Sequence, residues 1–338
     1  MSPLQGCGLF FVRFAVKSAD VPSARFSWGS ALRVLHGPST PAFAVRVSPD
    51  GRVAAALHLL GNGGPLHTLS VWDLHAGAVE PYRVVEGNFS GFAFSGTGEW
   101  IAVAGDAVHF VRTSDLGRLG GLTTQVAGVS TKPDADAVWL AQSDSQRALL
   151  VTSSPTNGPH QAVPLDGTGR LQAQIGTMDL APDGNRLALV YLNQNNPRAG
   201  LVIGLFDLEK KKLVDRFSTR RRQIQALRFA PDGRMLAVLT TTQVLVWDVV
   251  TKKRLALLEP KSGKESRFTL AVEFGRDGRR LFIGTDDGLH LYDTTTWTPT
   301  RRYDFDIGPI LSLAMTPDGL CGLAGGNSGR IAVWDLDD

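Results

Sequence analysis

Cysteine is scarce in this sequence, which argues against a fold stabilised by a disulfide framework. Only Cys7 and Cys321 occur among 338 residues, whereas small disulfide-rich domains carry several pairs. Cys321 lies in an apolar run, Leu320 to Ala324, where we expect a buried strand and a thiol that packs as a small hydrophobic group. A disulfide between the two cysteines is the minor alternative. This cysteine usage fits a reducing cytosol.

Long apolar segments are missing as well. No run reaches the ~18 apolar residues of a membrane-spanning helix. The apolar stretch Leu9 to Val16 is interrupted by Arg13, and no basic segment precedes it, whereas a secretory signal has a positive start and an unbroken apolar run. We therefore expect a cytoplasmic protein without a membrane partner. Residues 1–30 are interpreted as an N-terminal arm, either partly ordered or paired as an extra strand onto a sheet edge.

Charge is low too, with 20% of the residues charged and a net formal charge of +3. This balance is too weak to attract a nucleic acid or a membrane to the whole surface. Aromatic residues do not alternate with basic ones, so no platform for stacking bases is indicated. A hydrophobic content of 43% and 37 glycines instead favour an all-β protein with a large core.

Common catalytic motifs are missing too. The seven histidines are scattered, and the chain has no His-Glu-x-x-His, Gly-x-Ser-x-Gly, P-loop or Cys-x-x-Cys sequence, the patterns that mark common metal, hydrolase and nucleotide sites. The acidic pairs Asp286-Asp287 and Asp304-x-Asp306 are better explained by turn chemistry and by solvent exposure than by a metal. We predict no catalytic residue, no metal and no cofactor.

The sequence does contain one recurring pattern, and its clearest copy is Phe229 to Asp248. The turn Pro231-Asp232-Gly233 opens this copy, because proline sets φ near −65°, aspartate can bond its own backbone and glycine accepts a positive φ. Short apolar strands surround the turn and its successors, at residues 226–229, 235–239, 244–247 and 254–258. Four such strands joined by tight turns predict one antiparallel sheet.

The turn recurs seven times, at intervals of roughly 37–49 residues, which brackets the blade period of a propeller. Its copies are centred on Pro49-Asp50-Gly51, Gly96-Thr97-Gly98, Pro133-Asp134-Ala135, Pro182-Asp183-Gly184, Pro231-Asp232-Gly233, Arg276-Asp277-Gly278 and Pro317-Asp318-Gly319. Behind five of them, a third strand ends in an aromatic residue followed by aspartate: Trp72-Asp73, Phe206-Asp207, Trp247-Asp248, Tyr292-Asp293 and Trp334-Asp335.

With these residues the chain, from about Ala31 onward, resembles the WD-repeat β-propellers, with degenerate repeats. The resemblance implies a seven-bladed β-propeller of four-stranded antiparallel blades, which occupies residues 31–338 as one domain. The sequence departs from the family pattern because the Gly-His dipeptide before the first strand is missing, with only His36-Gly37 in reverse order. The hydrogen-bonded network that this histidine joins is therefore in doubt in most blades, although Asp287 stands at the position of its aspartate.

Closure of the ring is predicted from the two ends of the pattern. The seventh repeat ends with its third strand, at Trp334-Asp335, and so lacks a fourth. Residues 31–35 resemble the fourth strand of other repeats, such as Arg254 to Leu258. We therefore predict that this N-terminal strand completes the last blade and leaves no bare edge there.

A basic cluster is the candidate partner-binding site. Between Glu209 and Arg302 the chain has 20 Lys or Arg against 11 Asp or Glu. In a propeller the links between blades lie on one face, which is the commoner partner site in the WD-repeat family. The residues predicted there are Arg220, Arg221, Arg222, Lys261, Lys264, Arg267 and Asn195. They would attract an acidic or phosphate-bearing partner, whereas the alternative is a solvated rim that keeps the ring soluble.

The aromatic–aspartate strand ends are predicted to be structural. A large ring fills the wedge between blades and the aspartate opens the next turn, so we assign Trp72, Asp73, Trp247, Asp248, Tyr292, Asp293, Trp334 and Asp335 to packing and turn formation.

Three hypotheses of function follow. The first, by analogy with the family, is a non-catalytic protein–protein interaction scaffold, a monomeric ring that presents loops on one face to a protein or peptide. The alternative is a propeller enzyme, a hydrolase or lactonase-like protein with a metal in the central channel, whose ligands would come from several blades. A third is that the chain is part of a larger kinase or sensor.

Overall fold

The fold is described by a computed structural model for residues 33–336, except 60–66, 78, 82, 124–125, 127, 132–135, 144–147, 156–158, 165–177, 193–200, 219–222, 263–264 and 267. Within these ranges the chain is built from β-strands, and no helix there is long and apolar enough to cross a membrane. The predicted arm, residues 1–30, lies outside the described residues.

The strands of the described residues form seven four-stranded sheets, in each of which neighbouring strands are antiparallel. Three of the sheets follow one another along the chain: β2 (Ala42–Val47), β3 (Val53–Leu59), β4 (His67–Asp73) and β5 (Arg83–Gly87); β6 (Phe89–Phe94), β7 (Trp100–Gly105), β8 (Val108–Arg112) and β9 (Arg118–Leu122); β10 (Gly128–Thr131), β11 (Val138–Ser143), β12 (Ala148–Ser153) and β13 (Pro159–Pro164).

Three more sheets have the same order, and a seventh combines the two ends of the described chain. They are β14 (Met178–Leu180), β15 (Arg186–Leu192), β16 (Leu201–Asp207) and β17 (Lys212–Ser218); β18 (Ala226–Phe229), β19 (Met235–Leu239), β20 (Val244–Asp248) and β21 (Lys253–Leu258); β24 (Thr269–Phe274), β25 (Arg280–Thr285), β26 (Gly288–Asp293) and β27 (Pro299–Tyr303); and β28 (Ile310–Met315), β29 (Cys321–Gly326), β30 (Arg330–Asp335) and β1 (Arg33–His36).

Turn chemistry explains how consecutive strands reverse direction. In the sheet of β18 to β21, Gly233 has a φ of +66°, which an L side chain rarely adopts. Its amide donates to the Ala230 carbonyl at 2.8 Å, and the Asp232 carboxylate accepts the Arg234 amide at 2.8 Å. The turn therefore forms from a few neighbouring residues, independently of the rest of the ring.

Among the described residues, the hydrophobic core is divided into seven clusters of buried residues, and each cluster joins two consecutive sheets. For example, Leu239 and Val244 of one sheet pack with Phe274 and Ile283 of the next. The second and third strands are therefore buried on both faces, as the apolar runs predicted. Each sheet is held by its neighbours rather than by a single common core.

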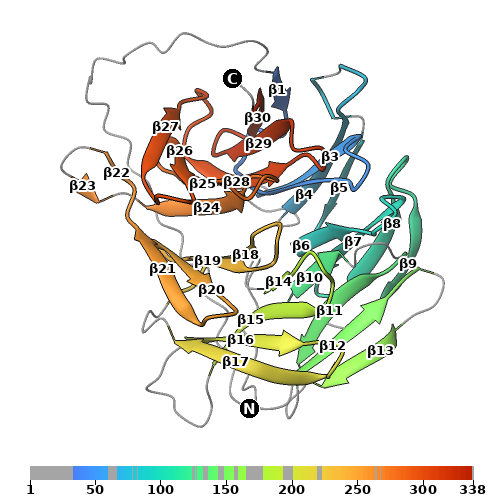
Figure 1. The fold of residues 1–338 in the computed structure, drawn as a ribbon. Coiled ribbons are helices and arrows are strands. Elements are labelled where there is room, and N and C mark those ends of the chain that lie inside the picture. Colours follow the sequence, from blue (N-terminus) through green and yellow to red (C-terminus); the bar gives the residue numbers. More distant parts are fainter. Residues whose placement is uncertain are drawn as a thin grey trace, which may run out of the picture.

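The sheets stand around a centre, with their first strands innermost (Figure 1). Contacts connect these first strands in the order β2, β6, β10, β14, β18, β24 and β28, and β28 in turn contacts β2. An all-β propeller of four-stranded antiparallel blades, which the repeat pattern predicted, is thereby confirmed. The predicted strand at 226–229 coincides with β18, and the predicted fourth strand at 254–258 lies within β21.

The N-terminal strand lies beside the C-terminal one (Figure 1). β1 pairs with β30 in antiparallel register, with Arg33 opposite Val333 and Leu35 opposite Ile331. Of the predicted segment 31–35, residues 33–35 lie in this strand and the first two are outside the described residues. Leu35 is fully buried, in a cluster that includes Trp72 of β4 and Ile331.

Two details differ from the sequence expectations. The link between β21 and β24 contains a small hairpin, β22 (Lys261–Ser262) paired with β23 (Glu265–Ser266), which no repeat signal predicted. Cys321, expected to be buried, is half-buried and its thiol is free. It begins β29 at the rim, where the sheet is less covered. Cys7, with which a disulfide was only the minor alternative, lies outside the described residues.

Candidate functional site

The aromatic side chains at the strand ends lie between sheets. Trp72 is fully buried and Trp334 is 5% exposed. The Trp334 ring lies 5.0 Å from that of Phe305 and 6.1 Å from that of Phe282, both of which belong to the preceding sheet or the segment after it. The indole nitrogens of Trp72, Trp247 and Trp334 are buried without a hydrogen-bond partner. These rings therefore contribute through apolar packing rather than through hydrogen bonds.

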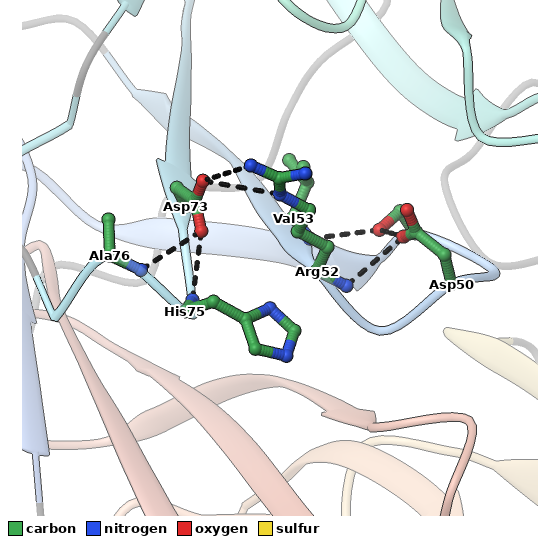
Figure 2. Close-up of polar contacts among 7 residues, drawn as sticks. Asp50, Arg52, Val53, Asp73, His75 and Ala76 are labelled. Carbon is green, nitrogen blue, oxygen red and sulfur yellow. Dashed lines mark hydrogen bonds and ion pairs between the residues drawn. The ribbon is translucent and has the colours of Figure 1, made fainter.

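The aspartates that follow these rings hold the next turn. Asp73 Oδ1 accepts the backbone amides of His75 and Ala76 at 2.9 and 3.1 Å (Figure 2). In the other sheets, Asp248 accepts those of Val250 and Thr251, and Asp293 those of Thr295 and Thr296.

Hydrogen bonds to the ionised carboxylate stabilise the charged form. The Thr251 amide, above all, lowers the pKa of Asp248 to about 2, and the Thr295 hydroxyl does the same for Asp293. Asp335 is exposed at the end of β30.

The predicted partner-binding residues are not brought together by the described part of the fold. Arg220, Arg221, Arg222, Lys264, Arg267 and Asn195 lie outside the described residues. Lys261 lies in β22, opposite Ser266 of β23. The basic cluster therefore stays a prediction from the sequence.

A local polar network surrounds Asp287, in the turn between β25 and β26. Its Oδ1 accepts the Thr285 hydroxyl at 2.5 Å and lies 3.0 Å from His290 Nε2, and Arg302 is 3.5 Å from its Oδ2. Burial alone would raise the pKa of Asp287, but the hydrogen bonds of His290 and Thr285 hold it well below its usual range. The histidine of this network comes from β26 of the same sheet, which the missing Gly-His dipeptide did not indicate.

Four charged side chains occur on the innermost strands, a feature that the sequence analysis missed. Arg46, Asp179, Arg228 and Glu273 lie on β2, β14, β18 and β24. Arg228 Nε donates to Glu273 Oε2 at 3.1 Å, and Asp179 accepts the Phe229 amide at 2.7 Å. Each residue stands near the end of a first strand, just before a turn, so the recurrence of charge at this repeat position was a usable signal.

Burial and the charges of this cluster shift the pKa values of Arg46, Asp179 and Arg228. Burial raises the pKa of Asp179 to about 6 and, together with the charge of Arg228, lowers that of Arg46 to about 10. Burial opposes the charge of Arg228 too, but the carboxylates of Glu273 and Asp179 outweigh it and raise its pKa. The cluster has two cations and two acids, so it is close to neutral as a whole.

Two histidines join the first sheet to its neighbours. The His58 ring is buried, with Nε2 3.2 Å from the Gly329 carbonyl in the turn between β29 and β30. His67 Nδ1 accepts the Phe89 amide at 3.2 Å, at the start of β6. Burial lowers the pKa of His58 to about 4 and also lowers that of His67. Both rings are therefore neutral at physiological pH.

Acid is expected to weaken the fold through His58. Its folded-state pKa is depressed below the unfolded value of about 6.5, so the stability it contributes is present above pH 6.5 and is lost as the pH falls towards 4. Compared with a His58→Asn variant, the wild type should lose roughly 1–3 kcal/mol between pH 7 and pH 4. Chemical denaturation at a series of pH values measures this difference.

The stability of the wild type must be compared with that of the His58→Asn variant, because Asp179 also titrates in this pH range. Its raised pKa has the opposite sign, because stability then falls as the pH rises from about 4 to about 6. The difference between wild type and His58→Asn at each pH cancels that contribution. Parallel stability curves for the two proteins would contradict the role assigned to His58.

A cleft of about 1000 Å³ lies between the sheets of β2–β5 and β6–β9 and is bordered by residues of the next sheet. On the first sheet, the cleft is lined by turn residues drawn in Figure 2. There, Arg52 Nε and Nη2 donate to Asp73 Oδ2 at 3.4 and 3.3 Å. The Asp50 carboxylate, in turn, accepts the Arg52 amide. The first-to-second and third-to-fourth strand turns line the cleft, so it opens on the rim opposite to the predicted partner face.

Carboxylates outnumber cations around this cleft. Those lining it are Asp50, Asp73, Glu80, Glu99 and Asp136, against Arg52 and Arg112. Asp136 accepts the Trp100 indole N–H, which ties the third sheet to the second. Among the described residues, no group of three or more His, Cys, Asp or Glu side chains is arranged to hold a metal ion.

Comparison with known proteins agrees with the fold. No family model matches the chain. It is 28% identical over 117 residues to the target of rapamycin complex subunit wat1 of Schizosaccharomyces pombe, covering 34% of this chain and 36% of that protein. It is 33% identical over 82 residues to the small ribosomal subunit protein RACK1 of Dictyostelium discoideum, a match that covers 20% of this chain and 25% of that protein.

The chain thus spans about a third of the length of wat1 and about a quarter of the length of RACK1. Both are WD-repeat proteins, and together with the propeller fold they confirm the resemblance to the WD-repeat β-propellers.

Proposed function

We propose that this chain is a non-catalytic protein-interaction scaffold, a monomeric cytoplasmic ring of seven WD-repeat blades closed by its N-terminal strand. The observation that carries the proposal is the series of cores that join consecutive sheets, including the one between the sheet of β1 and that of β2. Such a ring holds its surface turns in fixed positions, which suits display to partners. Its relatives include a subunit of the target of rapamycin complex and a protein of the small ribosomal subunit, both named as components of larger assemblies.

The closure is supported by strand pairing on one side of the joint and by packing contacts between sheets on the other. β1 completes the sheet of β28–β30, and the innermost strand of that sheet contacts β2. β1 covers the edge that β30 would otherwise expose, which limits edge-to-edge aggregation.

The proposed partner face is that of the links between blades, where an acidic protein or peptide would meet the basic cluster. The experiment first captures partners with the intact protein and identifies them. Each purified partner is then titrated against the protein to measure its affinity. Changing Arg221, Arg222 and Lys264 to Glu is expected to weaken binding of an acidic partner more than tenfold, because like charges then face each other.

A matched control changes three cations on the opposite rim, Lys212, Lys253 and Arg254, to Glu. These side chains are exposed, so the variant has the same net charge without touching the proposed face. An equal loss of binding in both variants would show that net charge alone matters, and unchanged binding in the first would remove the basic cluster from the proposal.

A further inference from the structure

The cleft between the first and second sheets has a local charge opposite to that of the chain. The whole sequence is formally +3, whereas five carboxylates and two guanidinium groups line the cleft. Arg52 is engaged with Asp73, and Arg112 lies 2.8 Å from Asp115, which is not one of the lining residues. Both cations of the cleft are thus already paired, and the remaining carboxylates give the cleft an excess of negative charge.

Glu99 is the most available of these carboxylates. It is exposed, it follows the turn between β6 and β7, and its side chain forms no hydrogen bond or ion pair with the described part of the chain. Glu80 is also exposed and lies 3.2 Å from His36. Asp50 and Asp136 are held in place by their own neighbours, so their charges are fixed at the edges of the cleft.

Apolar side chains accompany these charges. Val53, Leu119 and Pro155 line the same cleft and are partly exposed. Trp100 also lines it, but it is only 3% exposed and is held by its bond to Asp136. A concave surface that combines apolar contact area with a few fixed polar groups is typical of a binding site. Its volume of about 1000 Å³ is at the upper end for small ligands and accommodates several side chains of a peptide.

The charge selects among possible ligands. A nucleic acid or an anionic membrane would bring phosphates against the carboxylates, which is unfavourable. A cationic side chain gains from the same field, and Lys or Arg can lay its apolar stem on the apolar part of the cleft while its charge meets a carboxylate.

We propose that this cleft binds an extended Lys/Arg-rich segment of a protein partner, with its cations against Glu99 and neighbouring carboxylates and its apolar side chains on Val53, Leu119 and Pro155. This inference rests on the proposed scaffold function and adds a second surface to it. The two surfaces differ in charge, so they select different partners, and a ring that carries both can hold two proteins at once.

The test is a titration of the full chain with a fluorescein-labelled dodecapeptide of alternating Arg and Leu, followed by fluorescence anisotropy. A peptide in which Glu replaces every Arg is the probe control. The wild type is expected to bind the Arg peptide, more weakly as salt is raised, and not the Glu peptide. Glu99→Arg should weaken binding about tenfold, because an attractive contact becomes a repulsive one.

Glu209→Arg is the matched protein control. Glu209 is exposed in the turn between β16 and β17, on the same rim but in another sheet, and its replacement changes the net charge equally. Binding by this variant should stay within twofold of the wild type. Equal weakening in both variants, equal binding of the two peptides, or no binding by the wild type would each overturn the cleft proposal.

These outcomes separate the cleft from the scaffold function. If partners captured by the intact ring bind Glu99→Arg and wild type equally, and the Arg peptide does not bind, the cleft proposal fails while the scaffold proposal stands. If no protein partner binds the ring by any surface, the scaffold proposal fails.

Discussion

Replacing Trp72 with alanine is expected to lower the free energy of unfolding by about 3–5 kcal/mol, the range for removing a large buried aromatic side chain. Trp72 is fully buried and packs in the cluster that joins the first and last sheets, with Leu35 and Ile331 among its neighbours. Loss of the ring leaves a cavity at a joint where few atoms can move to fill it, because strands on both sides are fixed by their own sheets.

Trp72→Phe separates packing from hydrogen bonding. The indole nitrogen has no hydrogen-bond partner, so phenylalanine loses some contact area but no hydrogen bond. We expect it to cost less than half as much as alanine, as measured by the midpoint and slope of guanidinium unfolding. If the two variants were equally destabilised, the indole N–H would be contributing an interaction that the structure does not contain.

Replacing Leu35 with alanine is expected to cost about 2–5 kcal/mol, although this residue is near the N-terminal end of the described chain. Leu35 is fully buried and faces Ile331 across the β1–β30 pair. In a propeller closed in this way, the N-terminal strand supplies part of the core that holds the last sheet to the first. The loss is measured by denaturant unfolding of the full chain.

His36→Ala is the matched control in the same strand. His36 is exposed, and its contact with Glu80 is between side chains that are 52% and 70% exposed, so the change should cost no more than about 1 kcal/mol. If Leu35→Ala were as mild as His36→Ala, the N-terminal strand would not be needed for stability and the closure proposal would be wrong.

Local chemistry explains why much of the fold was predictable. The turn Pro231-Asp232-Gly233 and the strands around it could be placed because the residues that specify them lie within a few positions of one another. The same holds for Asp73 and Asp248, whose carboxylates bond amides two and three residues ahead. The hairpin of β22 and β23 was missed because it belongs to a link and follows no repeat.

The candidate sites were far less predictable. The basic residues predicted as a partner site belong to the links, and most of them lie outside the described residues. No sequence pattern pointed to Glu99 or Asp136. Those two residues border one cleft only because neighbouring sheets stand side by side. Charges at one repeat position were visible in the sequence, but their mutual effects on pKa were not.

The sequence by itself determined the unit of this protein, a four-stranded sheet with tight turns, and its repetition, because periodicity and turn chemistry act over short distances along the chain. Tertiary structure alone decided which units touch. It placed Arg46 near Asp179 and His58 against Gly329. Such contacts depend on the packing of whole sheets against each other, and no short stretch of sequence specifies that packing.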